Sequence, residues 1–270
     1  MSQPVWFDTH AHLSDIKFDL DRHQTVKNAF DAGVSYIVEI ADGPDEWKKA
    51  QELSRNYINQ MWWSAGLHPY YADQASDEVW NQLSHLSLEP QFVAIGEVGL
   101  DYVKSSVSKD IQIKAFEKAI QISFQIDKPL IIHCRNAFED LIPILNSFDI
   151  NLKKLAQANK RPGVIHCFSG SIEHAKQLTE MGFFLGIDGP ITYPNSQSLR
   201  EIIKNFDIKN LVIETDSPYL PPQSHRGKRN EPALIPAIAE MVALLKKMEL
   251  SALSEQLLIN SFQLFRINRL

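Results

Sequence analysis

Eight short apolar runs, rich in β-branched residues, alternate along this chain with longer amphipathic stretches. This alternation limits the fold more than any other feature of the sequence. The apolar runs cover residues 5–12, 36–41, 61–67, 92–99, 129–133, 163–167, 183–187 and 211–215. The helical patterns between them cover residues 19–32, 44–57, 76–87, 108–126, 137–148, 172–181 and 196–205. A last stretch, 233–265, is typical of two helices separated near Leu250 and Ser251.

Strands that alternate with helices form parallel sheets, and eight such units close into a barrel. We therefore expect one domain, residues 1–270, folded as an α/β protein of the (β/α)8 TIM-barrel class. Its active site should lie at the carboxyl ends of the strands. A doubly wound open sheet is the alternative, but that fold usually carries a glycine-rich phosphate loop after the first strand, and this sequence has none.

The charge and hydropathy of the sequence limit the cellular compartment of the protein and the partners that it can bind. The formal net charge is −6, whereas a protein that coats nucleic acid is normally basic, so any contact with nucleic acid must be local. We see no apolar run of about 18 residues and no signal-peptide pattern at the start. We therefore expect a cytoplasmic protein without a membrane span, as a monomer, with Cys134 and Cys167 as free thiols.

Polar side chains stand at the carboxyl ends of five of the runs. They are His10 and His12, Glu97, His133, His166 and Asp216. One histidine at a strand end is usually structural. A set of such groups that converges on one barrel mouth needs partners for its charges, and a cation suits all of them. The sequence therefore predicts a metal site.

The first and fourth runs carry the most informative members of this set. His10 and His12 lie on the same side of a strand because side chains alternate, so together they can chelate one divalent ion. Asp8 lies on the same side of the strand as these two histidines, and it could accept a hydrogen bond from one of them or act as a ligand itself. Glu97 has two oxygens and can bridge two metals. The simpler alternative for Glu97 is an ion pair with Lys104 or Arg135.

Two acidic residues lie at the end of the eighth run: Glu214 is inside it and Asp216 directly follows it. Asp216 is placed to complete a metal site and to accept a proton from water, although an aspartate before Ser217 and Pro218 could instead serve only a turn. Glu214 alternates with Asp216 and could orient a ligand histidine. His133 and His166 are candidate ligands of a second metal.

The ordered series DTHAHL, GLHP, IGEVGLDY, IIHCR, HCFSG, ETDSPYL, HRGKRNEP and NSFQLF resembles the TatD family of metal-dependent deoxyribonucleases, a branch of the amidohydrolase-like barrels. The resemblance implies a first metal held by His10, His12, Glu97 and Asp216. It implies a second metal held by Glu97, His133 and His166. His68 and the HRGKRN segment, with Arg226 and Arg229, would face substrate phosphate.

By this resemblance the chain would hydrolyse phosphodiester bonds of DNA, trimming single-stranded or 3′ ends, with two divalent ions (Zn, Mn, Mg, Co or Fe). Asp216 would be the general base, and His68, Arg226 and Arg229 would neutralise the phosphate. Tyr70, Tyr71 and Phe168 could stack on bases. The family often has an arginine where Val103, Lys104 and Ser105 stand, and a further histidine where Tyr70 and Tyr71 stand. Both departures touch the substrate pocket.

Two other kinds of function remain open from the sequence. One is a barrel hydrolase acting on a cyclic amide, a phosphotriester or an aminoacyl ester, since some TatD-like proteins deacylate D-aminoacyl-tRNA. Many such barrels bridge their metals with a carboxylated lysine on the fourth strand, where this chain has Glu97. The other is a metal-binding scaffold without catalysis.

Overall fold

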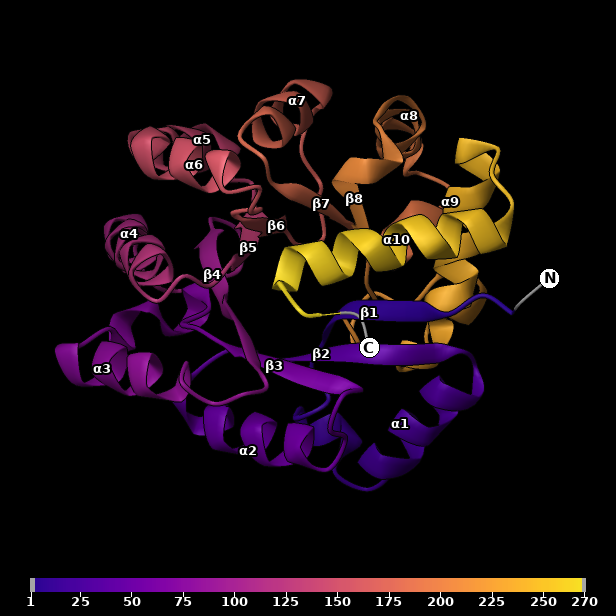
Figure 1. The fold of residues 1–270 in the computed structure, drawn as a ribbon, viewed down its shortest axis with the longest axis horizontal. Helices are drawn as coiled ribbons and strands as arrows, with labels where there is room; N and C mark the ends of the chain where they lie inside the picture. Colours follow the sequence, from indigo (N-terminus) through magenta and orange to yellow (C-terminus); the bar gives the residue numbers. More distant parts are fainter. Residues whose placement is uncertain (1–2, 269–270) are drawn as a thin grey trace.

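The computed structural model describes residues 3–268, and its eight strands form one sheet of parallel strands in sequence order (Figure 1). The strands are β1 Trp6–Ala11, β2 Val34–Ala41, β3 Met61–Ala65, β4 Phe92–Asp101, β5 Leu130–Arg135, β6 Gly163–Ile165, β7 Phe184–Ile187 and β8 Leu211–Ile213. The chain just after β8 meets β1. There the amide of Asp216 donates to the carbonyl of His10 at 2.9 Å, and that of His12 to Ser217 at 2.7 Å. The predicted TIM barrel is confirmed.

Helices surround the sheet, as the alternation predicts (Figure 1). They are α1 Arg22–Asp31, α2 Pro44–Arg55, α3 Asp77–Leu86, α4 Lys109–Gln125, α5 Phe138–Ser147, α6 Asp149–Gln157, α7 Ile172–Glu180, α8 Gln197–Asn205, α9 Ile235–Lys246 and α10 Leu250–Phe265. Their apolar faces pack on outward-facing strand residues to form the larger core. None of the helices within residues 3–268 is long and apolar enough to cross a membrane.

Four details differ from the sequence prediction. Helix α6 was not expected, and only one of its residues, Leu152, is buried. Strand β4 continues to Asp101, two residues beyond the predicted end. Strands β6 and β8 each end two residues early, so His166 follows its strand. The break between the last two helices covers residues 247–249, directly before the predicted Leu250 and Ser251, and Lys247 there takes a left-handed conformation (φ 52°).

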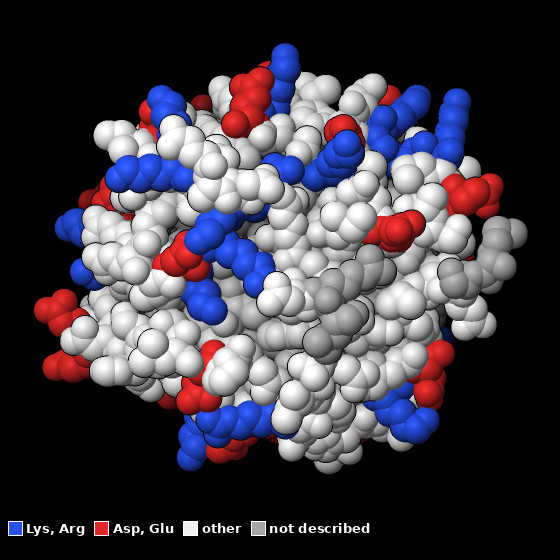
Figure 2. Space-filling model, in the orientation of Figure 1, with Lys and Arg blue, Asp and Glu red and all other residues white. Residues whose placement is uncertain are grey.

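A second core fills the barrel interior and is closed at one end by α10. Side chains from the strands, among them Phe7, Trp62 and Val212, meet Phe262 and Phe265 of α10. Helix α10 lies across this end in Figure 1. On the same face, Figure 2 shows acidic and basic side chains both spread over the surface. The polar residues at the carboxyl ends of the strands lie at the other end of the barrel.

Candidate metal centre

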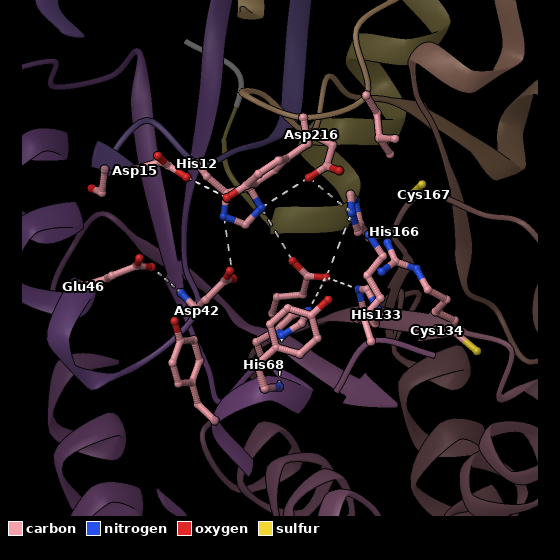
Figure 3. Close-up of a pocket in the computed structure, with 18 of the residues that line it drawn as sticks. His12, Asp15, Asp42, Glu46, His68, His133, Cys134, His166, Cys167 and Asp216 are labelled. Carbon is pink, nitrogen blue, oxygen red and sulfur yellow. Dashed lines mark hydrogen bonds and ion pairs between the residues drawn. The ribbon is translucent and has the colours of Figure 1, made fainter. Parts of the chain in front are cut away.

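The predicted ligands converge around one cavity of about 760 Å³. Its lining includes His12, Glu97, His133, His166 and Asp216 (Figure 3). His10 is completely buried beneath them. The residues come from β1, β4, β5 and the turns that follow β6 and β8. The barrel therefore brings together side chains that are more than 200 positions apart in the chain.

Glu97 stands between two groups of histidines, and its two oxygens face different groups. Its Oε2 lies 3.1 Å from His10 Nε2 and 3.7 Å from His12 Nε2. Its Oε1 lies 2.7 Å from His133 Nδ1 and 4.0 Å from His166 Nε2. The alternative of an ion pair with Lys104 or Arg135 does not occur among the described residues. One carboxylate thus connects both groups of donors, as a bridging ligand must.

Asp216 completes the group around His10 and His12. Its Oδ1 lies 3.3 Å from His12 Nε2 and 3.8 Å from His10 Nε2. The same atom is 3.7 Å from His166 Nε2. Asp216 also belongs to a turn, because its carbonyl accepts from the amide of Tyr219 at 2.8 Å. The turn places the carboxylate of Asp216 beside the histidines, so the turn role and the ligand role predicted for this residue are compatible.

Three of the histidines have a carboxylate on the ring nitrogen that faces away from the cluster. Glu214 Oε1 lies 2.8 Å from His166 Nδ1, and Asp101 Oδ2 lies 3.1 Å from His133 Nε2. Asp42 Oδ1 is 3.7 Å from His12 Nδ1. A carboxylate in this position fixes the tautomer and leaves the other nitrogen free to bind a metal. His10 instead stacks on His166, with ring centroids 3.5 Å apart.

The electrostatics of the cluster favour positive charge. Burial alone would lower the pKa of each histidine, yet nearby carboxylates outweigh it at three of them. Asp42 and Asp216 hold the pKa of His12 well above its ordinary value. Glu214 and Glu97 raise the pKa of His166 to about 10, and Asp101 and Glu97 raise the pKa of His133.

The carboxylates of the cluster show the complementary shifts. Burial would raise the pKa of Glu97, but His166 and His10 hold it well below the ordinary value. Burial likewise opposes ionisation of Asp216, while the hydrogen bond from His12 and the charge of His166 lower its pKa. Glu97 and Asp216 are therefore ionised and paired with the histidines around them, and the same side chains could hold a metal ion.

The donor set fits divalent metal ions. Four groups of possible ligand atoms lie within 4.8 Å of one another: His10, His12 and Asp216; His10, Glu97 and His166; His68, Glu97 and His133; and His12, Asp42 and Glu97. The Nε2 atoms of His10 and His12 face each other at 3.0 Å, which suits two donors to one ion. Imidazole and carboxylate ligands together suit Zn, Mn, Fe or Co.

His68 lies beside this cluster in a neutral form. Burial lowers the pKa of its imidazole to about 3. Its Nδ1 accepts from the amide of Tyr70 at 3.2 Å, so the proton is on Nε2, which lies 3.8 Å from Glu97 Oε1. The sequence prediction gave His68 a charge-neutralising role. In the structure His68 lines the cavity and lies close enough to Glu97 and His133 to share an ion with them.

The two predicted phosphate-binding arginines do not line this cavity within residues 3–268. Arg229 binds both carboxylate oxygens of Asp21, at 2.8 and 2.6 Å, and Glu231 at 2.8 Å. Arg226 lies over the ring of Tyr193, 4.4 Å from its centroid. Phe168, a candidate for base stacking, is buried in the core. Tyr70 and Tyr71 do line the cavity.

Several residues of the site escaped the sequence reasoning. Lys104 and Arg135 are the basic side chains on the β4–β5 side of the cavity, and the sequence prediction gave neither of them a role in binding phosphate. Asp101 shares the strand phase of Glu97, and this period of two could have identified it. The carboxylate of Asp8 accepts a hydrogen bond from the amide of Thr215 at 2.9 Å and so connects β1 to the segment after β8. Asp8 belongs to none of the groups of possible metal ligands.

Known proteins resemble this chain along nearly its whole length. The model of a family described as TatD related DNase matches residues 7–266. The uncharacterized metal-dependent hydrolase YabD of Bacillus subtilis is 36% identical over 262 residues, which is 97% of this chain and 99% of that protein. The 3′-5′ ssDNA/RNA exonuclease TatD of Erwinia tasmaniensis is 34% identical over 266 residues, covering 97% of this chain and all 100% of that protein.

Solved structures show the same fold. The crystal structure of the TatD homologue YjjV from Escherichia coli matches with a TM-score of 0.86 at 27% sequence identity. The match covers 97% of this chain and 98% of that one.

Proposed function

Since this chain belongs to the TatD family and is a metal-dependent hydrolase, we propose that it removes nucleotides from the 3′ end of single-stranded DNA with two divalent ions. The relative from Erwinia tasmaniensis, whose name specifies a 3′-5′ ssDNA/RNA exonuclease, supports this choice of substrate. The cavity volume of about 760 Å³ also supports it, because this is the size of sites that enclose small ligands. Such a cavity suits the end of a strand.

The placement of Glu97 carries the proposal. Its Oε2 faces His10 and His12, which lie beside Asp216, and its Oε1 faces His133 and His166. In this assignment Glu97 would serve as a ligand together with both groups of histidines. When bound, divalent ions in such a pair stabilise charge on phosphate oxygens and make water a stronger acid.

The chain's own residues supply proton transfer and positioning. Asp216 is ionised, because the histidines lower its pKa, so it can accept the proton of an attacking water. His68 presents its Nε2–H to the cavity and can donate to a non-bridging phosphate oxygen. Lys104 and Arg135 line the same cavity and can attract the phosphates of the strand.

Substituting Glu97→Gln tests this function. We expect the number of metal ions bound per chain to fall, measured by native mass spectrometry. We expect hydrolysis of a 3′-hydroxyl single-stranded DNA to fall by at least about a hundredfold, because paired metals contribute several kcal/mol. Glu240→Gln, an exposed change on α9, is the matched control.

The substrates should be compared in parallel. DNA, RNA and a D-aminoacyl-tRNA are each assayed with metal and with EDTA. Full DNA hydrolysis by the Glu97→Gln variant would contradict the bridging role. Metal-dependent cleavage of the aminoacyl ester alone would make the chain a deacylase. Hydrolysis of none of the three would favour a binding scaffold.

A further inference from the structure

The cavity carries opposite charges on its two sides. Asp15, Asp42, Asp45 and Glu46 line the side formed by the ends of β1 and β2 and the start of α2. Lys104 and Arg135 line the side that follows β4 and β5. In Figure 3, Asp15, Asp42 and Glu46 lie on the left of the cavity, whereas His133 and Cys134 lie on its right.

The acidic side lies at the amino end of helix α2. Such an end normally attracts anions, because its amides are free and the helix dipole is positive there. Here Asp45 and Glu46 occupy the first turn, and Glu46 Oε2 accepts from the amide of Asp42 at 3.0 Å. A phosphate would meet these carboxylates in place of free amides.

One lysine also lines the acidic side, but its charge is already compensated. The ammonium group of Lys49 lies 2.9 Å from Asp19 Oδ1 and also donates to the carbonyl of Ser14. It therefore leaves this side negative.

The basic side is open to an anion. The ammonium group of Lys104 makes no ion pair with any residue from 3 to 268, while its backbone amide is fixed by Asp101 Oδ1 at 2.8 Å. Arg135 contacts Asp101 Oδ2 at 3.2 Å through one nitrogen. Its side chain is 38% exposed. A strand of nucleic acid is therefore attracted to one side of the cavity only.

From this asymmetry we propose that Asp45 and Glu46 make the site specific for a strand that ends in a free 3′-hydroxyl. The inference rests on the function proposed above. The strand lies over Lys104 and Arg135, its last nucleotide enters the cavity, and its 3′-hydroxyl faces Asp45 and Glu46. An ionised carboxylate only accepts hydrogen bonds. A hydroxyl can donate to it, whereas a phosphate cannot and is repelled.

The same repulsion acts on a strand that continues past the cavity. Its next phosphate would lie against the acidic side, as a terminal 3′-phosphate would. The two carboxylates therefore exclude internal cleavage and phosphorylated ends for one physical reason.

The test compares one single-stranded DNA sequence with a 3′-hydroxyl end and with a 3′-phosphate end. The measured quantity is the ratio of kcat/KM for the two ends. We expect native protein to prefer the hydroxyl end. We expect the preference to fall about tenfold or more in the Asp45→Asn/Glu46→Gln double variant, because two like charges are removed.

The matched control is Asp77→Asn/Glu78→Gln. These residues occupy the first turn of α3 and do not line the cavity, so the variant changes the same kind of helix end. It should keep the native ratio. Thermal unfolding establishes that both variants are folded. Raising the ionic strength should lower the preference of native protein without any substitution, because salt screens charge repulsion.

The outcomes separate the two proposals. Hydrolysis of neither end by native protein would overturn the exonuclease function and this inference with it. Equal hydrolysis of both ends by native protein would overturn the inference alone. An unchanged ratio in a folded double variant would also overturn it.

Discussion

At the level of single residues, Asp101 connects a metal-site histidine to the loop that lines the substrate side. Its Oδ1 accepts from the amides of Val103 and Lys104, at 2.9 and 2.8 Å. Its Oδ2 faces His133 Nε2 and Arg135 Nη1, at 3.1 and 3.2 Å. The side chain is fully buried. Both a ligand and the basic side of the cavity therefore depend on one carboxylate.

Asp101→Asn should make metal-free protein less stable in a pH-dependent way. Burial opposes ionisation of Asp101, but the bonds from His133 and the loop amides hold its pKa below the ordinary 3.8. A depressed carboxyl pKa stabilises the folded state above about pH 4, and this contribution is lost as pH falls through the folded pKa. At neutral pH the variant should lose about 1–3 kcal/mol, because its amide group faces two donors.

Urea unfolding of both proteins across the acidic range measures this effect. The difference between native protein and variant should shrink once the pH is below about 4. A difference that is constant from neutral to acidic pH would contradict the assigned contacts.

The sequence predicted the converging residues better than it predicted their neighbours. Strand alternation and position identified the six residues from His10 to Asp216, because ligands stand at strand ends. Strand alternation could not predict the surroundings of Arg229, because its partner Asp21 is 208 positions away in the chain. Long-range ion pairs of this kind leave no local pattern. Arg226 and Arg229 were therefore predicted to face substrate phosphate, whereas in the structure they contact Tyr193 and Asp21.

At the level of elements, β7 approaches the segment after β8 so closely that only glycine fits. A Cβ on Gly186 would lie 2.3 Å from Glu214 Oε1. That oxygen accepts from His166 Nδ1 at 2.8 Å and from the Cys167 amide at 2.7 Å. The packing of these elements thus holds the carboxylate that orients His166.

Gly186→Ala should therefore weaken metal binding although residue 186 is not a ligand. We expect metal affinity to fall about 10- to 100-fold, as when a carboxylate behind a ligand histidine is disturbed. Competition with a chelator measures the affinity. Gly227→Ala, where an added Cβ meets nothing within 4 Å but the φ of 82° disfavours a side chain, should lower stability without changing metal affinity. Native affinity in a folded Gly186→Ala protein would show that Glu214 does not orient His166.

Element boundaries were harder to predict than element types. All eight strands were expected, because each carries a clear apolar run. Three-residue strands such as β6 and β8 are limited by pairing with neighbours, which a single run does not reveal. Helix α6 follows α5 directly, with only Phe148 between them, and buries only Leu152, so the sequence prediction ended the helical stretch at Phe148.

At the level of the whole molecule, the two ends of the barrel have separate tasks. The carboxyl ends of the strands hold the site, while α10 closes the other end. Phe262 of α10 packs edge-on against Phe7, with centroids 5.5 Å apart, and against Tyr36 at 5.1 Å. Barrels generally divide stability and catalysis in this way.

Phe262→Ala should lower the free energy of unfolding by about 3–5 kcal/mol, because it leaves a cavity in the barrel core. Metal affinity and kcat/KM of the folded protein should remain native. Ile259→Ala, a change on the same helix at a side chain that is 46% exposed, should cost less than about 1 kcal/mol. Denaturant titration gives the free energies. A parallel loss of metal affinity would show that the two ends are coupled.

The closure of β1 against the chain after β8 also governs when the site can exist during protein synthesis. His10 is made early, but its carbonyl pairs with the amide of Asp216, which is synthesised only after four-fifths of the chain. A shorter nascent chain therefore holds five of the six converging residues without their final frame. The candidate metal site is complete only once the chain after the last strand has joined the first strand, so any activity that depends on this site must wait for that step.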